Sequence, residues 1–120
     1  MLEQVLSALG ELRSPFALYE SDIHQTVEKR LIEAGLPYVH EAKLGPGCRI
    51  DYLVEGVGVE IKKGKPDGAK LRQQLARYAA CGQISALVVL SSRSVNLPDT
   101  LMGKPVRLIV LNRLWGVALP

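Results

Sequence analysis

The chain has 120 residues, of which 48% are hydrophobic and 22% are charged, and its formal net charge is +3. This length suits a single domain over residues 1–120 with a hydrophobic core, and the composition excludes an intrinsically disordered chain. No apolar run is long enough to span a membrane, and the first residues lack the pattern of a secretory signal. We therefore expect a cytoplasmic protein without a membrane partner.

Two helices are predicted in the first third of the chain. Apolar residues recur at helical spacing over residues 2–12 and indicate a short amphipathic helix within an N-terminal segment of residues 1–15. A second helix is predicted from about residue 19 to residue 34, because Gly35 and then Pro37 follow it. The buried stripe of this helix is predicted to comprise Ile23, Val27, Leu31 and Ala34.

The rest of the chain is predicted to alternate between strands and one further helix. Strands are expected at 37–44, 48–54 and 57–62, with a turn at 45–47 and a tight reversal at Glu55-Gly56-Val57-Gly58. A loop at 64–68 leads to a helix at 69–81 and then to a strand at 85–91 that is covered on both faces. Residues 92–103 are predicted to form a loop with a helical turn around Asp99 to Met102, followed by strands at 106–112 and 114–118.

This order of elements predicts an α/β fold with a mixed central sheet and helices on its faces. The core is expected over residues 19–91, and the C-terminal strands over residues 105–118. The crossover between the strands at 57–62 and 85–91 is expected to carry the 69–81 helix over the acidic face of the sheet.

Two acids and a lysine are predicted to meet on neighbouring strands. Asp51 interrupts an apolar run on one strand, and Glu60 and Lys62 flank Ile61 on the next. Because strand side chains alternate, Glu60 and Lys62 share a face, and the reversal between the strands lays Asp51 beside them. Two adjacent carboxylates bind a hard divalent cation, and a neighbouring ammonium can orient or deprotonate water. The pattern therefore predicts metal-dependent phosphodiester hydrolysis, although it also fits structural ion pairs with Lys62 and Arg49.

The second helix offers candidates for a third acid. Glu20 projects into the predicted buried stripe, where a carboxylate needs a partner, whereas Glu28 lies towards solvent. We therefore favour Glu20 and keep Glu28 as the alternative. Glu20 also suits a helix N-terminus, where the helix dipole favours an acid. His24 lies at the edge of the stripe. It could support the site, but we favour its interpretation as a hydrogen-bonded residue at the border of the core.

Basic residues gather after the two acids: Lys62, Lys63, Lys65, Lys70, Arg72 and Arg77. Such a cluster attracts a polyanion and holds its phosphates near a metal, whereas the alternative is a solvated helix face, which suits Lys70 and Arg77. On the same helix, Gln74 and Tyr78 are one turn apart and share a face. A glutamine at this position could contact the attacking water or a phosphate oxygen.

These elements together resemble the PD-(D/E)XK nuclease superfamily. The matching residues are Glu20, Ile50-Asp51, Glu60-Ile61-Lys62 and Gln74-Leu75-Ala76-Arg77-Tyr78, the last similar to the QLxxY element of the RecB-like branch. The spacing from Glu20-Ser21 to Gly35 and on to the acid also resembles small proteins known by a GxxExxY motif. One departure is that Ile50 precedes Asp51, where the superfamily often has a proline.

The resemblance implies a restriction-endonuclease-like fold and a Mg²⁺ or Mn²⁺ ion held by Asp51, Glu60 and the backbone carbonyl of Ile61. Glu20 would complete the coordination directly or through water. It also implies that Lys62 positions or activates the attacking water and stabilises the developing phosphorane charge.

The expected substrate is DNA. The residues that would contact the nucleic acid are Lys63, Lys65, Arg72 and Tyr78. Gln74 would orient the water or the scissile phosphate. The alternative is a non-catalytic nucleic-acid-binding or assembly module with a nuclease-like fold. A homodimer through the 2–12 helix or the 105–118 strands would let so small a nuclease reach two strands.

Overall fold

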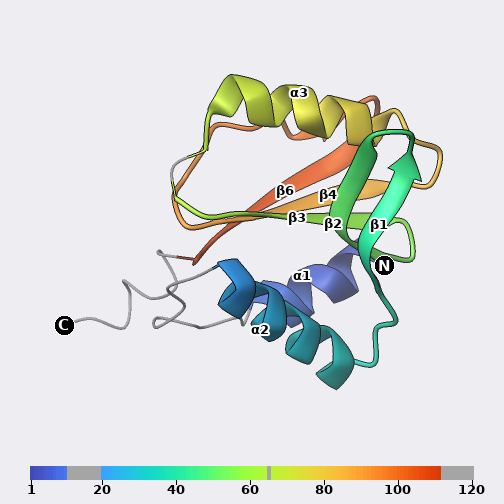
Figure 1. Cartoon of the computed structure of the whole chain (residues 1–120), viewed down its shortest axis with the longest axis vertical. Helices are drawn as coiled ribbons and strands as arrows, with labels where there is room; N and C mark the ends of the chain where they lie inside the picture. Colours follow the sequence, from blue (N-terminus) through green and yellow to red (C-terminus); the bar gives the residue numbers. More distant parts are fainter. Residues whose placement is uncertain (11–19, 65, 112–120) are drawn as a thin grey trace.

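A computed structural model describes residues 1–10, 20–64 and 66–111, with the backbone alone for residues 20–22 (Figure 1). Within these residues, three helices and six strands follow one another along the chain. The helices are α1 (Leu2–Gly10), α2 (Glu20–Glu33) and α3 (Gly68–Ala79). The strands are β1 (Val39–Gly45), β2 (Cys48–Val54), β3 (Val57–Lys62), β4 (Ala86–Ser91), β5 (Thr100–Leu101) and β6 (Lys104–Val110).

The strands form one mixed sheet in the order β1-β2-β3-β4-β6-β5. β1, β2 and β3 are antiparallel neighbours, β3, β4 and β6 run parallel, and β5 is antiparallel to β6. Figure 1 shows α3 on one face of the sheet and α1 with α2 on the other. The predicted α/β class and the mixed sheet flanked by helices are therefore confirmed.

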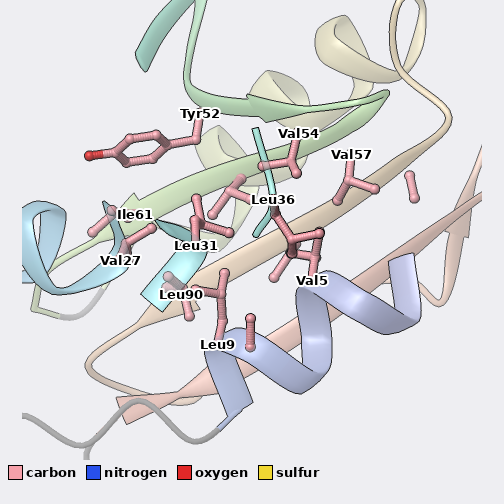
Figure 2. Close-up of a cluster of buried hydrophobic side chains, with 14 of the residues drawn as sticks. Val5, Leu9, Val27, Leu31, Leu36, Tyr52, Val54, Val57, Ile61 and Leu90 are labelled. Carbon is pink, nitrogen blue, oxygen red and sulfur yellow. The ribbon is translucent and has the colours of Figure 1, made fainter. Parts of the chain in front are cut away.

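The sheet separates two hydrophobic clusters. The cluster beneath α1 and α2 includes Val57 and Ile61 of β3 together with Val27 and Leu31 of α2 (Figure 2). The other cluster lies beneath α3 and includes Leu71, Leu75, Leu87 and Val89. Because helices cover both faces, β3 is buried from residue 57 to residue 61, and one of these buried residues is Glu60.

The tight reversal between β2 and β3 consists of two residues. Glu55 and Gly56 both have positive φ angles, of 46° and 92°, and Val54 pairs directly with Val57. Two central residues with positive φ are typical of the hairpin turn whose twist matches that of the strands, and Gly56 adopts this conformation without a steric cost. The turn fixes the register that brings Asp51 opposite the second acid.

The bounds of β2 and β3 are as predicted, and α3 is displaced by one or two residues. The helical turn predicted around Asp99 to Met102 is wrong, because Thr100–Leu101 forms β5 and pairs with the start of β6. Ala34 is exposed rather than part of the buried stripe, because α2 ends at Glu33. The predicted strand at 114–118 and the end of the first predicted helix lie outside the described residues. None of the helices that the structure describes is long and apolar enough to cross a bilayer.

Gly58 of β3 packs against the cluster beneath α3. An added Cβ would lie 2.5 Å from Cδ1 of Ile50 and 3.0 Å from both Cδ1 of Ile84 and Cδ2 of Leu87. All three side chains are fully buried, so they have little room to move. We expect Gly58→Ala to lower the free energy of unfolding by about 2 kcal/mol in urea denaturation. Gly82→Ala, where nothing lies within 4 Å, is the control, and equal stability of the two variants would contradict this packing.

Candidate active site

Asp51 and Glu60 meet where β2 and β3 separate. The last residues paired between these strands are Tyr52 and Val59. Beyond them, the backbone N–H of Asp51 donates to Oε1 of Glu60 over 3.3 Å, and the N–H of Ile61 donates to Oδ2 of Asp51 over 2.7 Å. Each carboxylate thus accepts a hydrogen bond from the opposite strand, and the two acids are held side by side as the sequence predicts.

A change of face in the β1–β2 hairpin produces this separation. Ile50 belongs to the cluster beneath α3, whereas Tyr52 belongs to the cluster beneath α1 and α2. Residues two apart on a regular strand share a face, so the strand turns between them. Across the hairpin, Glu41 has a φ of 52°, and the paired residues on either side are Ala42 with Ile50 and His40 with Tyr52. Asp51 therefore occupies the bend, with its carboxylate beside β3.

Glu60 is buried, with 5% of its surface exposed. Burial and then the negative charge of Asp51 raise the pKa of its carboxyl from 4.5 to about 7. The ammonium of Lys62 lies 3.2 Å from Oε2 of Glu60 and opposes this rise. Because Lys62 compensates only part of the cost of ionising Glu60, a second cation near both acids would stabilise their charged forms.

The raised pKa of Glu60 predicts a pH-dependent stability. Between pH 4.5 and 7 the folded protein holds a proton on Glu60 that the unfolded chain has lost. The contribution of this proton to the free energy of unfolding is therefore lost as pH rises through 7. In EDTA, wild type should lose on the order of 2 kcal/mol relative to Glu60→Gln between pH 5 and pH 8. Urea denaturation at several pH values measures the difference, and a constant difference across this range would contradict the burial of an ionisable Glu60.

Gln74 and Tyr78 form a short hydrogen-bonded chain between α3 and β2. Nε2 of Gln74 donates to the hydroxyl of Tyr78 over 2.9 Å, and that hydroxyl donates to the carbonyl of Arg49 over 2.8 Å. Burial and the charge of Glu60 raise the pKa of Tyr78. Only 3% of Tyr78 is exposed, and its predicted contact with nucleic acid stays a prediction. Its hydrogen bonds fix α3 over the acidic strands and hold Gln74 in place.

The other predicted nucleic-acid contacts are placed differently. Arg72 is exposed, and its Nη1 donates to the carbonyl of Asn96 over 3.0 Å, in the loop between β4 and β5. Lys63 is exposed directly after β3. Lys65 and the side chain of Glu20 lie outside the described residues, so their predicted roles stay predictions.

The sequence places Glu28 towards solvent, but in the structure its carboxylate is hydrogen-bonded. Its Oε2 accepts a hydrogen bond of 2.6 Å from Tyr52, and its Oε1 accepts one of 2.9 Å from Tyr38. The bond from Tyr52, supported by that from Tyr38, lowers the pKa of Glu28. The ring of His24 packs near those of His40 and Tyr52, with centroids 5.4 and 5.5 Å away. Both residues thus belong to a polar and aromatic cluster around Tyr52, beside α2 and away from α3.

A groove of about 420 Å³ lies beside the acids, along α3. Its polar lining comprises Lys62, Asp67, Lys70, Gln73, Gln74 and Arg77. For Lys70 and Arg77 the sequence leaves two interpretations open, a phosphate-binding cluster and a solvated helix face, and it does not single out Gln73. The signal that could have identified them is their helical spacing, which places residues 70, 73, 74 and 77 on one side of the helix.

The described residues fit a hard divalent cation at the acids. Asp51 and Glu60 supply carboxylate oxygens, and Mg²⁺ is commonly held by one or two carboxylates together with water and substrate oxygens. Within residues 1–10, 20–64 and 66–111, apart from the side chains of residues 20–22, no group of three His, Cys, Asp or Glu residues is gathered for a metal. The remaining ligands would therefore come from the Ile61 carbonyl, from water, from the substrate or from Glu20.

Comparison of the chain with protein-family models, with curated proteins and with solved structures gives no match.

Proposed function

We propose that this chain is a metal-dependent nuclease with a restriction-endonuclease-like fold, and that its substrate is DNA. The observation that carries the proposal is the contact between Asp51 and Glu60, with Lys62 beside them at the end of β3. A buried acid that is kept ionised only in part by its lysine partner is costly in a purely structural role. Carboxyl groups that lie beside an open groove and have a strongly shifted pKa are typical of functional sites.

The residues that would hold Mg²⁺ or Mn²⁺ are Asp51, Glu60 and the carbonyl of Ile61, with Glu20 as the predicted fourth. The ion, when bound, would supply Lewis-acid stabilisation of the phosphate and a lowered pKa for a bound water. The chain's contribution is to hold two carboxylates together. The backbone N–H groups of Asp51 and Ile61 fix one oxygen of each carboxylate and orient the pair.

Lys62 supplies a cation next to the acids. Its side chain is 30% exposed, so its ammonium is accessible both to water and to a substrate phosphate. In this position it can donate a hydrogen bond to the attacking water and stabilise the negative charge that develops on the phosphorane. Gln74 lies in the groove that Lys62 also lines, where its amide can orient the water or the scissile phosphate.

A non-catalytic nucleic-acid-binding module is the second candidate. The observation that favours it is the ion pair between Lys62 and Glu60, which would serve equally well in a protein that binds nucleic acid without cutting it. The two candidates differ in their need for a divalent ion at the acids, since only the nuclease requires one.

The test is cleavage of labelled linear, nicked and branched DNAs, with RNA of matching sequence, in Mg²⁺ or Mn²⁺. We expect cleavage that leaves a 5′-phosphate and a 3′-hydroxyl at the break and that stops when EDTA removes the metal. Glu20→Ala in the same panel tests whether that acid belongs to the site. Absence of cleavage of every substrate, together with absence of Mg²⁺ binding, would leave the binding module as the better explanation.

A further inference from the structure

The groove along α3 carries a net positive charge. Lys62, Lys70 and Arg77 contribute three cations to its lining, and the single acid among the described residues that line it is Asp67. The carboxylate of Asp67 is already engaged, because its Oδ1 accepts hydrogen bonds from the backbone N–H groups of Ala69 and Lys70 at the start of α3. Because Lys62 is paired with Glu60, Lys70 and Arg77 are the cations of this lining that can attract an anion from solvent.

The groove is continuous with the candidate active site through two residues. Lys62 lines the groove and lies 3.2 Å from Glu60. Gln74 also lines the groove, and its Nε2 donates to the hydroxyl of Tyr78, which in turn donates to the carbonyl of Arg49 on β2, the strand of Asp51. An anionic polymer that lies in the groove would therefore contact Lys62, next to the acid pair.

We propose that this groove binds the sugar-phosphate backbone of the substrate strand next to the cut, through Lys70 and Arg77. The inference rests on the proposed nuclease function and identifies the part of the substrate that the chain holds. Lys70, Gln73 and Arg77 are exposed, so their charged and amide groups can contact a ligand without rearrangement of the helix.

The composition of the groove favours phosphates over bases. No aromatic side chain is present among the described residues that line it, so bases find no stacking surface there. Ammonium, guanidinium and amide groups donate hydrogen bonds to phosphate oxygens of any sequence. Binding in the groove should therefore be independent of sequence and strongly dependent on salt.

The first test measures binding without cleavage. Labelled duplex DNA is titrated with protein in EDTA at several salt concentrations, and binding is followed by fluorescence anisotropy. Lys70→Ala/Arg77→Ala should bind about tenfold more weakly at about 0.1 M salt, and the slope of log K against log[salt] should fall by roughly 1.8. A slope equal to that of wild type would overturn the inference.

A matched control separates a local contact from a general loss of charge. Arg77→Ala and Lys29→Ala each remove one exposed cation, but Lys29 lies on α2, on the other face of the sheet. Only Arg77→Ala should reduce the salt slope, by roughly 0.9. Equal reductions in the two variants would show that net charge, and not the groove, determines binding.

The second test uses cleavage to locate the contact. With Mg²⁺, the double variant should lower kcat/KM for a long oligonucleotide by about tenfold and leave that for thymidine 5′-p-nitrophenyl phosphate unchanged, because the small substrate has no neighbouring phosphates. Equal losses on both substrates would place Lys70 and Arg77 in the chemistry and overturn the inference. If wild type cuts neither substrate, the nuclease proposal fails, and the binding measurement in EDTA still decides the groove.

Discussion

Lys62→Ala is expected to lower the rate of DNA cleavage by about 10³-fold at saturating substrate. The loss follows from two contributions of one ammonium, namely the hydrogen bond to the attacking water and the positive charge beside the phosphorane. A positioned proton-transfer group contributes typically 10²–10⁴-fold, and one electrostatic donor about 10²–10³-fold. Single-turnover cleavage of a labelled duplex with Mg²⁺ measures the chemical step directly.

A pH series distinguishes this role from an indirect one. Removal of Lys62 also removes the charge that opposes the rise in the pKa of Glu60. If Lys62 acted only by keeping Glu60 ionised, cleavage by Lys62→Ala would recover as pH rises to about 9. We expect no such recovery, whereas Lys29→Ala should cut at the wild-type rate throughout. Undiminished cleavage by Lys62→Ala would remove the proposed mechanism.

Local signals were sufficient to predict the strands that carry the acids. The alternation over residues 57–62 and the glycine in the reversal specify both the bounds of β3 and its register with β2, and hence the meeting of Asp51 and Glu60. The helix that follows these strands, α3, could be predicted equally well, because its apolar stripe and the loop before it indicate its position. By contrast, β5 is two residues long and has no periodicity, so its partner β6 determines its structure.

The surroundings of the acids depend on contacts that are distant in the chain. Glu28 was expected in solvent from its place beside the buried stripe of the helix, and nothing near it in sequence indicates that Tyr52, from β2, reaches its carboxylate. The change of face that brings Tyr52 there coincides with a positive φ at Glu41, which that residue type does not signal. Lys70 and Arg77 likewise resemble an ordinary solvated helix face until the position of Lys62 is known.

Asp51→Asn is expected to abolish stabilisation by Mg²⁺ and to lower cleavage by at least about 10³-fold. An amide is a poor ligand for a hard cation compared with a carboxylate, and the variant leaves Glu60 as the single acid of the pair. The fold should be retained, because asparagine keeps an oxygen that can accept the hydrogen bond from the N–H of Ile61.

Thermal and urea denaturation with and without Mg²⁺ detect the site independently of turnover. At Mg²⁺ about tenfold above its Kd, wild type should gain roughly 1.4 kcal/mol in the free energy of unfolding, and Asp51→Asn should gain nothing. Glu55→Gln, which neutralises an exposed acid in the turn of the same hairpin, should respond to Mg²⁺ as wild type does. Because each of the two variants loses one carboxylate, equal stabilisation of wild type and both variants would mean that the ion binds elsewhere and that the acid pair is not a metal site.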